Sequence, residues 1–257
     1  MRHWLPLLML LPSVLAQADN RLDKLAAAGV AEFIAAYQAW DGARFAAAAE
    51  LFREACANAP GSSTNFYWLG AAQFHRMLQL QTLPSEGANR LAADAAMDAA
   101  LAALNRAVKL NERDAESHAL LGTLYGMKID GNLFRGARFG PRVQTHRNKA
   151  MQFGKENPRV RYLLGTCQFH TAKKPAALRE ALASFLAAEE LFRAEAQRAP
   201  GPLEPRWGYS TCLTFIGRTY ESLGQRSQAA DYFRKALAEH PADHLAKEGL
   251  ARVTEKK

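Results

Sequence analysis

Cysteine is scarce in this chain, with three residues among 257: Cys56, Cys167 and Cys212. An odd number cannot pair completely. The helical pattern described below places Cys167 and Cys212 on neighbouring parallel helices with an offset of about 10 Å, whereas a disulfide needs Cα atoms within about 7 Å. The scarcity therefore excludes a disulfide-stabilised scaffold, and we expect three free, buried thiols that pack as small hydrophobic side chains.

Motifs that carry enzyme chemistry are also absent. The sequence contains no G-x-S-x-G, no H-E-x-x-H, no Walker loop and no G-x-G-x-x-G. His240 and His244 have the spacing of two zinc ligands on one helix face, but Pro241 stands between them and breaks the helix. We therefore expect no enzyme, no cofactor and no metal site. An enzyme would need an acid–base pair that converges from distant positions, and nothing in the sequence points to one.

No run of alternating β-branched residues is long enough for a sheet, and a helical pattern takes its place. Near the C terminus, small, large and helix-stopping residues recur at fixed offsets within a unit of about 34 residues. They are Leu213, Ile216, Gly217, Tyr220, Gly224, Ala229, Phe233, Ala236 and Pro241. The pattern resembles the tetratricopeptide repeat (TPR), in which two antiparallel helices cross at small residues. Gly217 and Ala229 would lie at that crossing, and Pro241 would end the second helix.

The same spacing recurs upstream, with unit ends at residues 60, 112, 158, 200 and 241. These units are longer than the usual TPR period of about 34 residues. We predict an all-α fold: a TPR α-solenoid of about five helix pairs with lengthened inter-helix loops and a C-terminal capping helix. The added loops are expected near 79–90, 127–141 and 171–178, and the capping helix over 243–253. A generic alanine-rich bundle is the competing interpretation, but Gly, Ala and Pro at fixed offsets argue against it.

The first eighteen residues are typical of a secretory signal peptide. A short basic head precedes an apolar run from Trp4 to Leu15, and Ala16–Ala18 has the small residues of a cleavage site. The run is shorter than the roughly 20 residues of a bilayer span. We predict a signal peptide over 1–18 and one TPR superhelical domain over 19–257, located in the periplasm or secreted. An uncleaved anchor is the alternative.

Basic residues exceed acidic ones, 33 against 25, for a net charge of +8. Such a balance is found in nucleic-acid-binding proteins, but export argues against that partner. An acidic partner or an anionic surface fits the charge better. Three cations, Lys128, Arg135 and Arg138, lie within 127–141, where Asp130 is the only acid. This segment is predicted to be either an anion-binding loop or a solvated loop whose Phe residues pack against the helices.

A narrower resemblance comes from four short segments. They are Tyr125–Ile129, Gly140–Pro141, Asn157–Val160 and Phe169–Thr171. Their order is similar to that in a group of exported bacterial TPR proteins, over roughly residues 45–200. Members of that group carry a Gly-Gly pair after the last segment, where this chain has Lys173–Ala177. The likeness implies a TPR fold and export, and it implies no activity.

The TPR resemblance implies a concave groove lined by the first helix of each pair. The positions that would face this groove are mostly aromatic: Phe33, Tyr37, Trp40, Tyr67, Phe74, His75, Tyr162, Phe169, His170 and Arg218. Aromatic residues and Arg dominate binding energy at protein interfaces. We therefore expect a scaffold that binds a peptide or envelope-protein segment in the groove. The alternative is an accessory protein for a transporter or a small hydrophobic ligand, which would require a closed apolar cavity.

Overall fold

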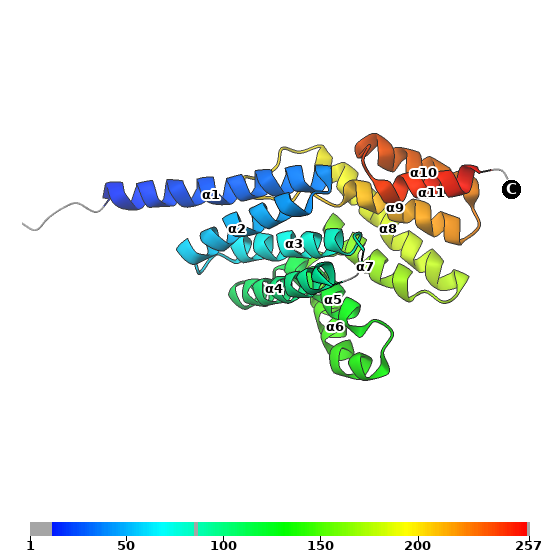
Figure 1. The fold of residues 1–257 in the computed structure, drawn as a ribbon, viewed down its shortest axis with the longest axis horizontal. Helices are drawn as coiled ribbons and strands as arrows, with labels where there is room; N and C mark the ends of the chain where they lie inside the picture. Colours follow the sequence, from blue (N-terminus) through cyan, green and yellow to red (C-terminus); the bar gives the residue numbers. More distant parts are fainter. Residues whose placement is uncertain (1–11, 85–86, 256–257) are drawn as a thin grey trace, which may run out of the picture.

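The protein is an array of packed helices, described here by a computed structural model that covers residues 12–84 and 87–255, with side chains from residue 24 onward (Figure 1). Within these residues eleven helices and no strand are found. The helices are α1 (Pro12–Ala39), α2 (Gly42–Asn58), α3 (Ser63–Leu80), α4 (Ala88–Leu110), α5 (Ala115–Ile129), α6 (Leu133–Gly154), α7 (Pro158–Thr171), α8 (Pro175–Ala196), α9 (Tyr209–Ser222), α10 (Arg226–Glu239) and α11 (His244–Thr254).

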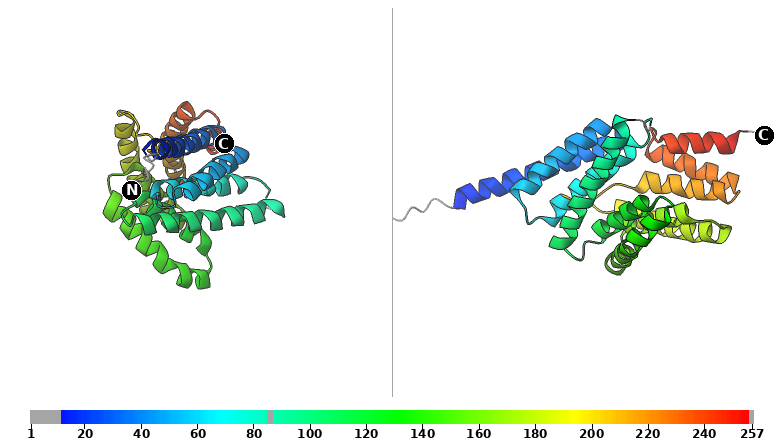
Figure 2. Two further views of the ribbon diagram at one scale, coloured as in Figure 1. Left: turned by 90° about the vertical axis from the view of Figure 1, so that its left-hand side faces the viewer. Right: turned by 60° about the horizontal axis from the view of Figure 1, so that its bottom comes forward.

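Consecutive helices pack in antiparallel pairs. The pairs are α1–α2, α3–α4, α5–α6, α7–α8 and α9–α10, and α11 packs on both α9 and α10. A continuous hydrophobic core runs through the pairs from Val30 to Val253. Figure 2 shows α1–α4 and α7–α11 as two groups of helices with α5 and α6 beside them. The predicted TPR solenoid of five pairs with a capping helix is confirmed.

Side chains before the helices explain where many of them begin. Asp41, Asn132 and Asn157 each accept a hydrogen bond from backbone N–H groups in the following first turn. Asp114 and Asp243 do the same for α5 and α11. Such N-caps satisfy donors that have no partner inside the helix.

The extra residues of the long units lie mostly in helices, which corrects the expectation of long loops. The connections within the second, third and fourth pairs span only 81–87, 130–132 and 172–174, while α4, α6 and α8 have 23, 22 and 22 residues. Pro141 lies inside α6 and is exposed. The longest connection lies instead between two pairs, at 197–208.

The predicted signal peptide falls largely on residues 1–11, which lie outside the described residues. The predicted cleavage site at Ala16–Ala18 lies within α1 as the structure describes it. Cleavage and the division at residue 18 therefore stay predictions. Among residues 12–84 and 87–255, no helix has both the length and the apolar character needed to cross a bilayer.

The three cysteines are free, as expected. Cys56 and Cys212 are buried, whereas Cys167 is only half-buried. Burial raises the pKa of the Cys56 thiol to about 12. A thiol that stays protonated is a poor nucleophile, so Cys56 has the packing role expected for it.

Gly217 shows how small residues set the approach of paired helices. A Cβ atom added at this position would lie 2.8 Å from two ring atoms of Phe233 on α10. Phe233 is fully buried, and the backbone of Gly249 on α11 presses on the same ring from another helix. The ring therefore has no room to move aside.

We expect Gly217→Ala to destabilise the protein by about 1–3 kcal/mol through overpacking. Gly126 on α5 is a matched control, because an added Cβ there meets nothing within 4 Å. Gly126→Ala should be neutral or stabilise by about 0.5–1 kcal/mol. Urea unfolding of both variants measures the difference, and equal stabilities would show that the assigned helix crossing is incorrect.

Candidate functional site

Four of the predicted groove residues on α1 and α3 are buried inside the protein. Phe33, Tyr67, Phe74 and His75 are at most 4% exposed. The His75 ring lies edge-on to Phe33 at 5.1 Å and to Trp207 at 4.8 Å between ring centroids. Burial is the largest influence on the pKa of His75, which it lowers to about 4. These side chains pack within the chain and have no surface for a partner.

The connection 197–208 covers this part of the concave face. The Trp207 Nε1–H donates to the Tyr67 hydroxyl at 3.0 Å, and the Trp68 Nε1–H donates to the Leu203 carbonyl at 2.9 Å. Sequence reasoning missed this segment. The feature of the sequence that could have indicated it is Trp207, a large aromatic residue of the kind that is usually buried. It follows a stretch with three prolines between 200 and 205. This segment of the same chain therefore fills the N-terminal half of the expected groove.

The end of α1 also contacts the last helix pair. Tyr37 and Thr211 share a hydroxyl–hydroxyl hydrogen bond of 2.5 Å, and the His240 Nε2–H donates to the Gln38 carbonyl at 2.6 Å. The Trp40 and His244 rings lie 6.5 Å apart. Tyr37 and Trp40 are therefore half-buried in a contact between the first and last units, and the solenoid is closed on itself at this point.

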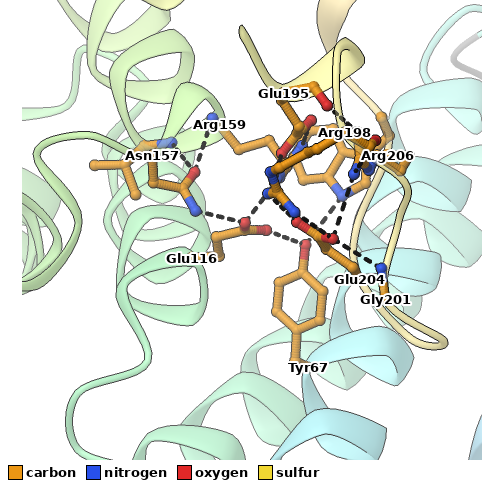
Figure 3. Close-up of polar contacts among 11 residues, drawn as sticks. Tyr67, Glu116, Asn157, Arg159, Glu195, Arg198, Gly201, Glu204 and Arg206 are labelled. Atoms are coloured by element: carbon orange, nitrogen blue, oxygen red, sulfur yellow. Dashed lines mark hydrogen bonds and ion pairs between the residues drawn. The ribbon is translucent and has the colours of Figure 1, made fainter. Parts of the chain in front are cut away.

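A buried polar network connects α3, α5, α7 and α8 (Figure 3). Arg159 donates from Nε to Glu116 at 2.8 Å and from its two terminal nitrogens to Glu195 at 2.9 and 2.5 Å. Glu116 also accepts from the Tyr67 hydroxyl at 2.5 Å and from the Asn157 amide at 2.7 Å. Burial acts to lower the pKa of Arg159, but Glu116 and Glu195 outweigh it and raise the pKa. The guanidinium is permanently charged, and each of its three nitrogens donates a hydrogen bond to a carboxylate.

The outer side of this network fastens the 197–208 connection. Glu204 is paired with Arg198, accepts from the Gly201 N–H at 2.9 Å and lies 3.3 Å from Arg206. The hydrogen bonds from Arg198 are the main reason that the pKa of Glu204 falls to about 2. Arg206 also donates to the Glu195 carbonyl at 2.5 Å. A pocket of about 620 Å³ adjoins the network. The charged residues on its wall are bonded within the network, apart from the exposed Lys155 and Glu156. We assign this region a structural role.

The remaining predicted groove residues gather on α7 and α9. Arg218 lies over the rings of Phe169 and Phe215, with its guanidinium carbon 5.2 and 4.9 Å from their centroids. The His170 ring meets Phe215 edge-on at 5.7 Å. Tyr162 lies beneath, buried, with its ring 6.1 Å from that of Phe215. We use the name Arg218 surface for Phe169, His170, Arg218 and Phe215. The first three of these are half-buried or exposed.

The charge of Arg218 is not neutralised by a direct contact. Within the described part of the chain its guanidinium has no carboxylate within ion-pair distance, because the nearby Glu221 is bonded to Arg252 at 2.9 Å. Burial is the main cause that lowers the pKa of Arg218. Burial likewise lowers the pKa of His170, which favours the neutral ring. The surface thus offers aromatic area and a cation whose hydrogen-bond donors are unused.

The predicted anion-binding loop is a helix, which corrects that expectation. Arg135 and Arg138 lie in the first two turns of α6, and Lys128 is in the last turn of α5. Lys128 is 2.7 Å from Asp98, and Arg138 lies over the Phe139 ring at 5.2 Å. Asn132 caps α6 through a hydrogen bond from the Arg135 N–H at 3.0 Å. The three cations therefore do not converge on one anion.

Small-ligand and metal sites find little support in the described residues. The apolar pocket between α5, α6 and α7 measures about 30 Å³, close to the volume of one water molecule and too small for a lipid. Among residues 12–84 and 87–255, no group of three or more His, Cys, Asp or Glu side chains is placed to hold a metal ion.

The fold matches those of solved TPR proteins. TTC0263, a thermophilic TPR protein of Thermus thermophilus, matches with a TM-score of 0.59 at 17% identity, over 88% of this chain and 98% of its own. A chain of the APC/C hetero-tetramer Cut9–Hcn1 matches with a TM-score of 0.51 at 13% identity, over 93% of this chain and 45% of its own. No protein-family model and no curated protein matches. The chain therefore has a TPR α-solenoid fold.

Proposed function

We propose that the protein is an exported, non-enzymatic TPR scaffold that binds a segment of another envelope protein on the Arg218 surface. The observation that carries this proposal is Arg218 itself. Its guanidinium lies over two phenylalanine rings, and in the described chain no carboxylate pairs with it. An arginine in such a position has donors ready for an incoming acceptor.

The chemistry of the surface suits a segment with both an aromatic and an acidic side chain. A carboxylate would receive two parallel hydrogen bonds from the guanidinium, a geometry that Lys cannot provide. An aromatic ring of the partner would pack against Phe169 and His170. Aromatic side chains and Arg are the residue types that contribute most at protein interfaces. The net charge of +8 favours an acidic partner in the same way.

Export is supported by the composition of residues 1–18, with a basic head, an apolar run and a small-residue cleavage site. The envelope is therefore the proposed location of the partner. The proposal is for a protein partner because the Arg218 surface is open, while the apolar pocket of about 30 Å³ leaves no space for a hydrophobic ligand.

Site-specific photo-crosslinking in cells tests the proposal. A photoreactive amino acid at the exposed position 170 should yield a cross-linked protein, recovered in the periplasmic fraction with an N terminus between Gln17 and Asp19. The same amino acid at Gln228, exposed on the outer helix α10, is the matched control and should yield none. Adding Arg218→Gln to the position-170 variant should lower the yield about tenfold or more, as expected for loss of a charged contact at an interface.

Two results would contradict the proposal. Equal cross-linking at positions 170 and 228 would mean that the Arg218 surface is not the site. Unchanged cross-linking with Arg218→Gln would mean that the guanidinium makes no contribution. Circular dichroism of each variant checks that the helices remain folded.

A further inference from the structure

The α5–α6 pair forms an arm that projects from the solenoid (Figure 1). In the described chain α6 contacts only α5 and α7. Of its 22 residues only Ala150 is buried. The N-terminal turns of α6 therefore form the far end of the arm, at a distance from the Arg218 surface on α7 and α9.

Two adjacent large apolar side chains occupy this far end. Leu133 is 89% exposed and Phe134 is 88% exposed, more than Leu91 and Leu83, the other exposed large hydrophobic residues of the described chain. Exposing such side chains to water costs free energy that burial would recover. No packing role inside the protein accounts for them. We call Leu133 and Phe134 the apolar tip.

Exposed arginines outnumber acidic residues around the apolar tip, where Asp130 in the α5–α6 connection is the nearest acid in the sequence. The sequence from 131 to 155 contains no Asp or Glu. Arg135, Arg138 and Arg142 are exposed and have no ion-pair partner in the described chain. Lys128, in the last turn of α5 beside the tip, is paired with Asp98 at 2.7 Å, and Lys149, nearer the root of the arm, is paired with Glu112 at 2.7 Å. The far end of the arm therefore carries an excess of positive charge.

We propose that the apolar tip inserts into the surface of an anionic phospholipid membrane and that the flanking arginines bind the lipid phosphates. Interfacial segments bury apolar side chains by about 5–10 Å, with basic residues at the level of the headgroups. At a rise of about 1.5 Å per residue, Arg138 and Arg142 lie about 7 and 13 Å along the helix from Leu133. Their charges are therefore placed where phosphates would be when the tip is immersed.

A membrane fits the arm better than a protein groove or a nucleic acid. A groove that receives a helix recognises apolar anchors at i, i+3, i+4 and i+7. Here the positions three and four residues after Leu133 and Phe134 are Gly136, Ala137 and Arg138, so no apolar stripe continues. A nucleic acid would use the cations but would not need the Leu-Phe pair. A membrane surface is fluid and requires no matching shape. It would contact both the Leu-Phe pair and the cations.

Vesicle flotation combined with hydrogen–deuterium exchange tests the proposal on the purified protein. We expect binding to phosphatidylcholine vesicles that contain phosphatidylglycerol, and weaker binding when salt is added. Backbone amides in 130–142 should gain protection from exchange with these vesicles and not with phosphatidylcholine alone. The local exchange signal separates the arm from any contribution of the apolar run at 4–15.

Leu133→Ser with Phe134→Ser should abolish the local protection and lower vesicle binding through the arm about tenfold or more, because the inserted apolar area is lost. Leu91→Ser on α4 is the matched control, since Leu91 is 67% exposed and far from the arm in sequence. It should behave as the wild type. Arg135→Gln with Arg138→Gln should reduce the preference for anionic vesicles, whereas Arg90→Gln with Arg179→Gln, also exposed, should not.

The proposal is overturned if the wild-type protein gives no protection in 130–142 with anionic vesicles, or if the double-serine variant is protected equally. It is also overturned if the protein binds duplex DNA more tightly than anionic vesicles with no effect of the double-serine change. That outcome would assign the arm to nucleic acid. Tip residues are exposed, so these substitutions should leave thermal unfolding unchanged.

Discussion

Replacing Arg159 with Met should destabilise the protein by about 3–5 kcal/mol, the usual cost of removing one partner from a buried ion pair. Arg159 is 2% exposed, and the side chains of Glu116 and Glu195 are 10% and 8% exposed. Methionine fills much of the volume but leaves Glu116 without a cation in a poorly solvated site, and leaves Glu195 with only the exposed Arg198, 3.9 Å away. The bonds from Tyr67 and Asn157 to Glu116 remain, so the cost comes from the uncompensated charge.

Arg44 on α2 provides a matched control. It also makes two hydrogen bonds to one carboxylate, that of Glu32 on α1, at 2.8 and 3.1 Å. Here the arginine and glutamate side chains are 44% and 27% exposed. Arg44→Met should cost far less than Arg159→Met, because water screens an exposed pair. Both variants lose an Arg–Glu pair, so the difference between their free energies of unfolding reports the effect of burial.

Urea unfolding at neutral pH measures both variants. A third variant combines Arg159→Met with Glu116→Gln and Glu195→Gln, which removes the two carboxylate charges. It should recover part of the lost stability, since interactions within one network are not additive. If Arg159→Met costs no more than Arg44→Met, or if the combined variant is less stable than Arg159→Met alone, the uncompensated charge is not the cause.

The solenoid could be predicted from the sequence because its geometry depends on local sterics. Gly165 and Gly217 stand at equivalent positions of the fourth and fifth pairs, and each faces the ring of a phenylalanine, Phe185 or Phe233, on the partner helix. Only a residue without a side chain permits that approach. Such contacts within a pair leave a regular spacing in the sequence, so the number of pairs was predictable.

The form of α6 was harder to predict because its local signals conflict. Gly136, Gly140 and Pro141 favour a loop, whereas Asn132 is a good N-cap for a helix starting at Leu133. The helix forms, and Pro141 is accommodated on an exposed stretch of it. The capping residue was the better signal, and the prediction of a loop gave it too little weight.

The concave face could not be predicted because its occupant comes from a distant part of the chain. Position within a repeat correctly places Tyr67 on the inner side of α3. It carries no information about Trp207, which lies 140 residues later and bonds to the Tyr67 hydroxyl. The same spacing therefore describes both a half-buried ring, such as Phe169, and a ring that a distant segment of the chain covers.

Acid should destabilise the protein through the histidine at the centre of the covered aromatic cluster. His75 is 3% exposed and donates from Nδ1 to the Ala71 carbonyl at 2.8 Å. Burial lowers its pKa to about 4, against about 6.5 for a histidine in an unfolded chain. Between these two values the unfolded state binds a proton and the native state does not.

The sign of the effect follows from that difference. Stability is highest above about pH 6.5 and falls as the pH decreases toward about 4, by about 3 kcal/mol for His75 at the low end. Burial also lowers the pKa of His118, His146 and His170, so these residues act in the same direction. The aromatic cluster that joins α1, α3 and the 197–208 connection is thus one acid-sensitive part of the molecule.

His75→Phe isolates this contribution, because phenylalanine keeps an aromatic ring among Phe33, Phe45 and Trp207 but cannot bind a proton. Urea unfolding of wild type and variant is compared at a series of pH values from neutral to about 4.5, within the window set by the two pKa values. The stability difference should be constant above about pH 7 and should shift in favour of the variant as the pH falls. Parallel curves over the whole range would show that His75 binds protons equally in the folded and unfolded states, and the covered cluster would then admit enough water to solvate the imidazolium.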